Sequence, residues 1–215
     1  MDATPFLAGC ASTFLWLRYA LLLEDVTMTG VNVVGLSAFS CYVLFYYAMS
    51  GNRRRIAFKI LAVISLLTAI VLVCSSREGP DSIFWSAICA CGSSLVACAS
   101  PLASLKRVLR TRSSESLPFA FIAFSFLNSL FWSWYGILAS NRFIVFPNAV
   151  GAFIAGCQLL LFLFFPAKAR PQSLLQTNGK LVSPCPAFAL SPVLWYSFQT
   201  SVDLSYSFLP PACMT

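Results

Sequence analysis

Aromatic and amide side chains recur at one fixed spacing inside two of the most apolar stretches of the chain. LWLRYALLLEDVTMTGVNVVG, residues 15–35, aligns without gaps with FWSWYGILASNRFIVFPNAVG, residues 131–151. The chemically useful residues that coincide are Trp16 and Trp132, Tyr19 and Tyr135, and Asn32 and Asn148. An amide offers hydrogen-bond donors and an acceptor, and an indole offers a flat apolar face. Keeping such groups inside two oily segments requires a functional explanation.

Other kinds of site chemistry find little support. The chain has no His, and no Ser/His/Asp set, carboxylate pair or phosphate-binding loop is visible, so we do not expect an enzyme. Most cysteines lie in or at the ends of apolar runs, where we interpret them as small packing residues. Cys89 and Cys91 form a C-x-C, but no second pair stands at a matching spacing. Neither a metal nor another cofactor is therefore predicted.

The elements that must carry the repeated residues are membrane-spanning helices. Hydrophobic residues make up 59% of the chain and charged residues 10%, against roughly 45–50% and about 25% in soluble domains. A helix needs about 20 apolar residues to cross a bilayer. Six runs meet this need, at residues 5–23, 28–49, 56–74, 83–105, 118–139 and 143–166.

The charges predict the orientation of these spans. The formal charge of +7 does not indicate nucleic-acid binding, because Lys and Arg are confined mostly to short connections between apolar runs. Basic residues at 53–59 and 106–112 fall on one side, which the positive-inside rule makes cytoplasmic. Six spans then place both ends of the chain in the cytoplasm. Residues 167–215, rich in Pro, Ser, Gln and Thr, are predicted to form a disordered tail.

The repeat predicts a transporter. In each copy a span ends with Trp-x-x-Tyr, a short turn follows, and the next span carries the Asn, so these groups can face each other across one helix hairpin. Parallel duplicated units are typical of transporters whose substrate site lies near the bilayer midplane between the repeats. A complete unit should contain three helices. We therefore divide the chain into residues 1–50, a first unit that lacks its first helix, a linker at 51–81, a second unit at 82–166 and the tail at 167–215.

Taken together, these residues resemble the SWEET sugar facilitators, also called the saliva or nodulin-type family. The resemblance covers residues 5–166. Within the family, the sequence looks closest to the animal members. It rests on Ser100-Pro101-Leu102, TRSSESLPF, FLNSLFWSWYG, FPNAVG and Gln158, and in the first unit on Pro5-Phe6, LWLRY and VNVVG. The family implies an all-α bundle of three plus one plus three helices, here incomplete, that moves mono- or disaccharides down their gradient.

The same resemblance implies roles for individual residues. Asn32 and Asn148 match the asparagines that bind sugar hydroxyls, and Trp16 and Trp132 match the residues that stack on the sugar. Tyr19 resembles one half of an extracellular gate whose partner is usually Asp. Asn141 stands at the partner position here. Because Asn is neutral, the sequence does not decide whether the gate contact is charged. The resemblance also implies that three prolines act as helix hinges, Pro5, Pro101 and Pro118.

Plainer interpretations compete with these roles. Trp and Tyr near span ends also form ordinary interfacial belts, and an Asn can join membrane helices without binding a substrate. The three prolines can simply kink their helices. The repeated spacing favours the functional interpretation for the Trp and Asn pairs.

The sequence therefore predicts energy-independent, bidirectional sugar transport by alternating access. No Asp or Glu lies in the middle of a span, so proton coupling is not expected. A rival hypothesis is a truncated, non-transporting isoform that acts as a partner subunit of full-length transporters, and a carrier for amino or organic acids ranks lower. The expected partners are a sugar, the lipid bilayer and further copies or relatives in an oligomer. We expect the plasma membrane, with the Golgi as the alternative.

Overall fold

The computed structural model describes residues 3–112 and 117–165 of the chain, and all regular structure in them is helical. These described residues form seven helices, and with the two helices at residues 80–111 taken as one segment they give six spans long and apolar enough to cross a membrane. This confirms the predicted all-α membrane fold with six spans. The helices are α1 (Thr4–Leu22), α2 (Val26–Met49), α3 (Arg53–Ser75), α4 (Pro80–Ala97), α5 (Ala99–Thr111), α6 (Phe119–Leu138) and α7 (Arg142–Phe164). The predicted tail at 167–215 lies outside the described residues.

The two copies of the repeat fold into two hairpins, α1–α2 and α6–α7, with the same turn. Glu24 and Ser140, which are equivalent in the repeat, both adopt a left-handed conformation with φ of 56° and 51°. The following amide of Asp25 or Asn141 bonds back to the carbonyl of Ala20 (3.0 Å) or of the equivalent glycine (2.8 Å). This is the bonding of a Schellman helix end. Asp25 and Asn141 then cap the next helix with their side chains.

Helices α4 and α5 act as one long span with a local break. The predicted fourth span at residues 83–105 is longer in the structure, because Pro80–Thr111 forms one candidate span of 32 residues. The break falls at Cys98 between α4 and α5. Pro101 follows three residues later and has no amide hydrogen, so the carbonyl four residues before it loses its helical donor. A local change of helical bonding at this point is the expected result.

Prolines at the other helix starts behave in two ways. Pro5 lies in the first turn of α1 and is buried, where its missing N–H costs nothing. Pro118 was predicted as the first helical residue of its span, which is wrong by one position, because it is the N-cap of α6 with an extended ψ of 96°. Pro147, which is not among the predicted hinges, lies inside α7 and is buried.

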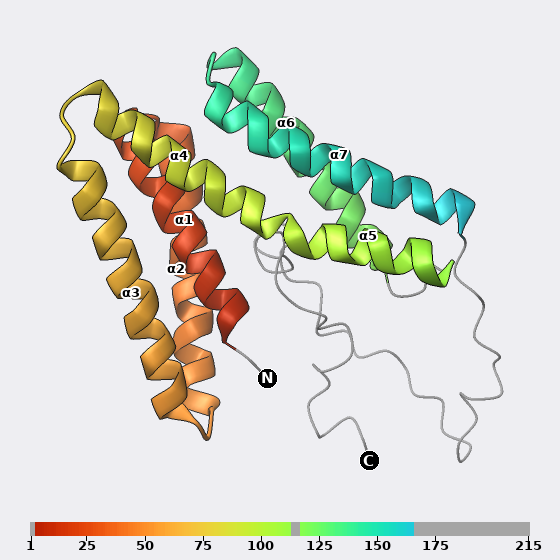
Figure 1. Ribbon diagram of the computed structural model, residues 1–215, viewed down its shortest axis with the longest axis horizontal. Helices are drawn as coiled ribbons and strands as arrows, with labels where there is room; N and C mark the ends of the chain where they lie inside the picture. Colours follow the sequence, from red (N-terminus) through yellow and green to blue (C-terminus); the bar gives the residue numbers. More distant parts are fainter. Residues whose placement is uncertain (1–2, 113–116, 166–215) are drawn as a thin grey trace.

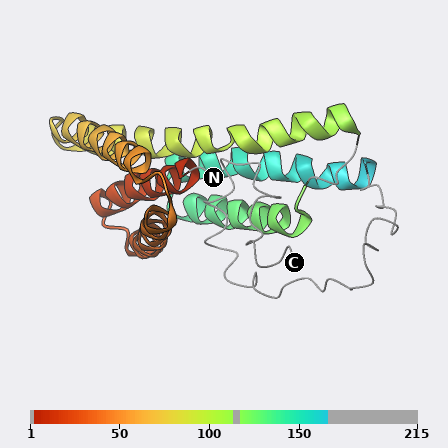
Figure 2. The same ribbon diagram turned by 90° about the horizontal axis from the view of Figure 1, so that it is seen from below.

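The two hairpins share a core at only one end. A cluster of buried residues at the turn end joins α1, α2, α4 and α7, whereas a second cluster lies within α1–α3 and a third within α5–α7 and the segment before α6. Figure 1 shows the consequence: α1, α2 and α3 run in one direction from the shared end and α5, α6 and α7 in another. The view from below in Figure 2 shows the same separation. The molecule is closed where the hairpins turn and diverges towards its basic end.

Candidate functional site

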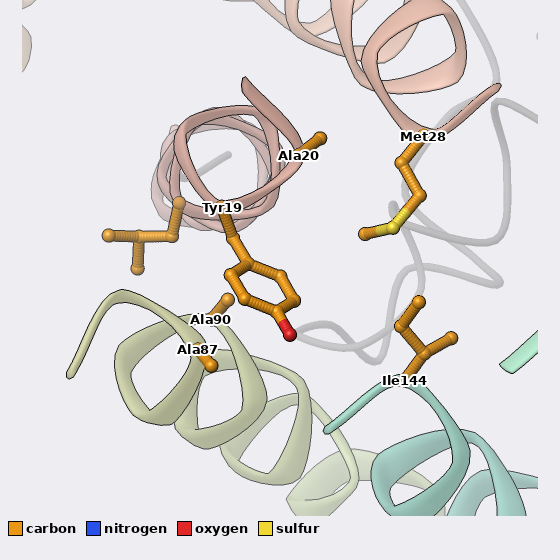
Figure 3. Close-up of a cluster of buried hydrophobic side chains, with 7 residues drawn as sticks. Tyr19, Ala20, Met28, Ala87, Ala90 and Ile144 are labelled. Carbon is orange, nitrogen blue, oxygen red and sulfur yellow. The ribbon is translucent and has the colours of Figure 1, made fainter. Parts of the chain in front are cut away.

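The shared cluster closes the space between the two repeats. Tyr19 stands at its centre, 2% exposed, and its hydroxyl end points towards the side on which Met28 of α2 and Ile144 of α7 lie (Figure 3). Met28 and Ile144 are equivalent in the repeat, so each hairpin contributes the same position to the closure. Ala87 and Ala90 of α4 are completely buried beneath the ring. Small residues there let α4 approach α1 closely.

Two tyrosine hydrogen bonds cross from one repeat to the other above this cluster. The Tyr19 hydroxyl donates to Asn141 Oδ1 at 3.1 Å and accepts from Asn141 Nδ2 at 2.8 Å. The Tyr135 hydroxyl donates to the Asp25 carboxylate, 2.8 Å from either oxygen. The constant offset makes Tyr19 equivalent to Tyr135 and Asp25 equivalent to Asn141. The two bonds are therefore one contact made twice, once with a neutral acceptor and once with a charged one.

We call these four residues the tyrosine latch. Its geometry answers the question that the sequence left open at Asn141: the Tyr19 contact exists but is neutral. The charged member is Asp25 with Tyr135, a contact that the family resemblance did not imply. Hydrogen bonds to a carboxylate are roughly twice as strong as neutral ones. The two sides of the latch should therefore differ in strength.

Trp16 and Trp132 both pack against the shared cluster. Each lies edge-on to the tyrosine of its own hairpin. The ring centroids are 6.0 Å apart for Trp16 and Tyr19 and 5.6 Å apart for Trp132 and Tyr135. Trp16 Nε1 also donates to Ser94 Oγ of α4 at 2.9 Å. One turn further from the latch, the Ser12 hydroxyl lies 3.0 Å from that of Ser93. The α1–α4 contact thus has a polar edge in an apolar bundle.

Asn32 and Asn148 make equivalent bonds in the two hairpins. Each Nδ2 donates to the carbonyl four residues earlier, from Asn32 to Met28 at 2.9 Å and from Asn148 to Ile144 at 2.8 Å. Both side chains are half-buried. Because Met28 and Ile144 belong to the closing cluster, each amide lies one helical turn further from the latch. No hydrogen bond in the described structure joins the two amides directly.

A third polar contact reaches the break between α4 and α5. Gln158 of α7 is 5% exposed, and its Nε2 donates to the carbonyl of Pro101 at 3.1 Å. A buried amide in a membrane helix needs such a partner. The contact ties the predicted hinge at Pro101 to the last helix. The predicted hinges Pro5 and Pro118 lie at helix starts, away from this contact.

Comparison with known proteins assigns the family. The profile of the family described as "Sugar efflux transporter for intercellular exchange" matches residues 1–54 and 85–170. The chain belongs to this family. Its members carry the name SWEET, which confirms the family resemblance seen in the sequence.

Relatives and a solved structure agree on the SWEET family. Sugar transporter SWEET1 of Drosophila pseudoobscura pseudoobscura is 37% identical over 190 residues, 87% of this chain and 82% of the relative. Sugar transporter SWEET1 of Caenorhabditis elegans is 32% identical over 176 residues, 82% of this chain and 58% of the relative. The 3.7 Å resolution structure of a eukaryotic SWEET transporter superimposes with a TM-score of 0.71 at 25% identity, covering 77% of this chain and 80% of that one. The chain is an integral membrane member of a family of sugar transporters.

Within this SWEET chain, several polar residues of the site escaped prediction. Asp25 and Tyr135 could have been found, because the offset that pairs Tyr19 with Tyr135 also pairs Asp25 with Asn141. Ser12, Ser93 and Ser94 carry no sequence signal of their own. Their contacts depend on how closely α1 and α4 approach, which the sequence does not state.

Proposed function

We propose that this chain carries mono- or disaccharides down their gradient, in both directions, by alternating access in the plasma membrane. The sugar would sit between Asn32 and Asn148, flanked by Trp16 and Trp132. An amide suits a hydroxyl-rich ligand as donor and acceptor, and an indole face covers the apolar C–H side of a sugar ring. The tyrosine latch would be the extracellular gate, and Pro101 the hinge nearest to the pathway.

The observation that carries this proposal is the pair of equivalent bonds of the tyrosine latch. They join the two repeats at the end that the positive-inside rule places outside. The hairpins diverge towards the other end, which supports a conformation closed to the outside and open to the cytoplasm. The two half-buried amides then lie on the open side of the closing cluster. A second conformation would break the latch and bring the basic ends together.

Uptake of radiolabelled glucose, fructose and sucrose by cells that express Asn148→Ala tests the site. We expect uptake to be abolished with surface expression unchanged, because the amide would supply bonds made directly to the sugar. The matched control is Phe153→Ala on the same helix, whose side chain is 73% exposed and faces away from the bundle. Unaltered uptake in Asn148→Ala would exclude the proposed site.

One observation favours a second candidate, a partner subunit that works with a full-length relative. Pro147, Gln158 and Leu161 of α7 are buried, and α4 and α5 both pack on this helix. The three equivalent positions on α2 are all exposed, Val31 at 44%, Tyr42 at 43% and Phe45 at 68%. The described residues contain no helix that packs on α2 as α4 and α5 pack on α7. A helix from another polypeptide could cover this face.

Sugar flux into liposomes separates the two candidates. Flux through the purified chain alone supports the carrier. Flux that arises only after co-expression with a complete relative, with the two chains purified as one complex, supports the partner subunit and removes the first proposal.

A further inference from the structure

Basic side chains gather at the end of α5, on the side predicted to be cytoplasmic. Lys106, Arg110 and Arg112 are exposed there. Val108 is completely buried against the α5–α7 cluster. At 100° per residue, Lys106 and Arg110 point away from the face that carries Val108 and Leu105. The two cations therefore face outward from the bundle, one helical turn apart.

The length of the helix places these cations at the level of the lipid headgroups. The span Pro80–Thr111 has 32 residues, so it is about 48 Å long, whereas the hydrocarbon core is about 30 Å thick. Counted from Ile83, the first apolar residue after Asp81, about 20 residues cross the core and end near Leu102. Lys106 and Arg110 then lie about 6 and about 12 Å beyond the hydrocarbon, less if the helix tilts.

Among the residues that the structure describes, no acidic side chain lies at this end of the molecule. The acidic residues in the described part of the chain are Glu24, Asp25, Glu78 and Asp81, and all lie at the opposite ends of their helices. Outside the described residues, Glu115 is one acid against the four basic residues Lys106, Arg107, Arg110 and Arg112, and the sequence after residue 165 holds Lys168, Arg170 and Lys180 against Asp203. That segment is itself basic and does not complement the α5 end. An anion from outside the protein is the electrostatic complement of this surface.

We propose that Lys106 and Arg110 bind the headgroup of a phosphoinositide in the cytoplasmic leaflet. Their outward direction at headgroup level selects a lipid over a soluble protein partner. A guanidinium binds phosphate oxygens in a bidentate fashion, and an ammonium adds a second positive charge about 6 Å along the helix. A phosphorylated inositol ring extends past the phosphodiester layer, so it reaches both heights. Phosphatidylserine has one carboxylate near the diester, so it matches only Lys106, the cation nearer to the hydrocarbon.

Native mass spectrometry of the purified full chain with added phosphatidylinositol 4,5-bisphosphate, phosphatidylserine or phosphatidylcholine tests this proposal. We expect the bisphosphate to be retained preferentially, and K106Q/R110Q to weaken its retention about thirty-fold, the combined effect of two basic residues near an anionic surface. K106R/R110K should bind as the natural chain does, because it keeps both charges.

The matched control is R54Q/R55Q at the start of α3, which removes the same charge on the same side of the membrane. Arg54 and Arg55 are adjacent in the helix and do not share a face, so this variant should retain the lipid. Equal weakening by both double variants would reduce the effect to general electrostatic attraction and overturn the proposed site. Equal retention of phosphatidylserine and the bisphosphate would overturn the assignment to a phosphoinositide.

Discussion

The substitution Asp25→Asn isolates the charged half of the tyrosine latch. An Asn is as good an N-cap as an Asp, so the bond that Asp25 accepts from the Met28 amide (2.9 Å) can survive. What changes is the contact with Tyr135, which loses its charged acceptor. A neutral hydrogen bond contributes about 1 kcal/mol and one to a charged group about 1.5–3 kcal/mol. The variant should therefore weaken the closed state by about 1 kcal/mol, about a five-fold shift towards the outward-open state.

The repeat supplies its own control for this substitution. Asn141→Asp places a carboxylate opposite Tyr19 and should stabilise the closed state by a similar amount. The double variant D25N/N141D exchanges the two acceptors and keeps one charged and one neutral contact. If the two contacts are equivalent, its open fraction should return close to that of the natural chain.

Labelling from outside measures the open fraction. A cysteine introduced at Ser12, which lies beyond the latch and Trp16 as seen from outside, reacts with a membrane-impermeant thiol reagent only when the latch is open. The same chain without the introduced cysteine gives the background from native thiols. We expect about five-fold faster labelling in Asp25→Asn and slower labelling in Asn141→Asp. Equal rates in all variants, or a double variant that labels as fast as Asp25→Asn alone, would refute the reasoning.

Three further predictions concern contacts around the latch. Gly136→Ala should lower the stability of the purified protein by about 1–3 kcal/mol, since the added Cβ would lie 2.8 Å from Val145 Cγ2 and 3.0 Å from the Val145 backbone nitrogen. The control is Gly92→Ala, whose added Cβ meets nothing within 4 Å. Equal thermal midpoints for the two variants would contradict the packing at Gly136. Gln158→Leu should cost about 1 kcal/mol of stability by removing the hydrogen bond from α7 to the Pro101 carbonyl. An unchanged thermal midpoint would show that this bond contributes nothing. Trp16→Phe and Ser94→Ala should each raise the KM for sugar about five-fold, and their double variant no further, because both remove the same bond; additive effects would separate the two residues.

The spans and the family followed from the sequence because both depend on local properties. Continuous apolar runs between charged connections located the six spans, and their observed starts and ends differ from prediction by only a few residues except after Leu105. That span continues to Thr111 because its last turns keep Leu105 and Val108 on the packed face and place Lys106 and Arg110 on the exposed one. A helix that leaves the hydrocarbon keeps its hydrogen bonds but no longer needs an apolar surface.

Contacts between helices could be predicted only where the repeat duplicated them. The offset made the Tyr19–Asn141 pair and the Tyr135–Asp25 pair two forms of one contact, so either implied the other. The Gln158 bond to Pro101 joins α7 to α5, and the first repeat has Tyr42 at the position equivalent to Gln158. Its partner depends on the close packing of two helices, which no local pattern specifies. The joint role of Asn32 and Asn148 in sugar binding stays a prediction.

Counterflow of radiolabelled sugar in liposomes that contain only the purified chain tests the central claim most directly. The account predicts saturable exchange that Asn32→Ala and Asn148→Ala each abolish, while Phe153→Ala leaves it unchanged. Exchange that persists in both asparagine variants, or the absence of exchange in the natural chain, would contradict a sugar pathway between the two repeats.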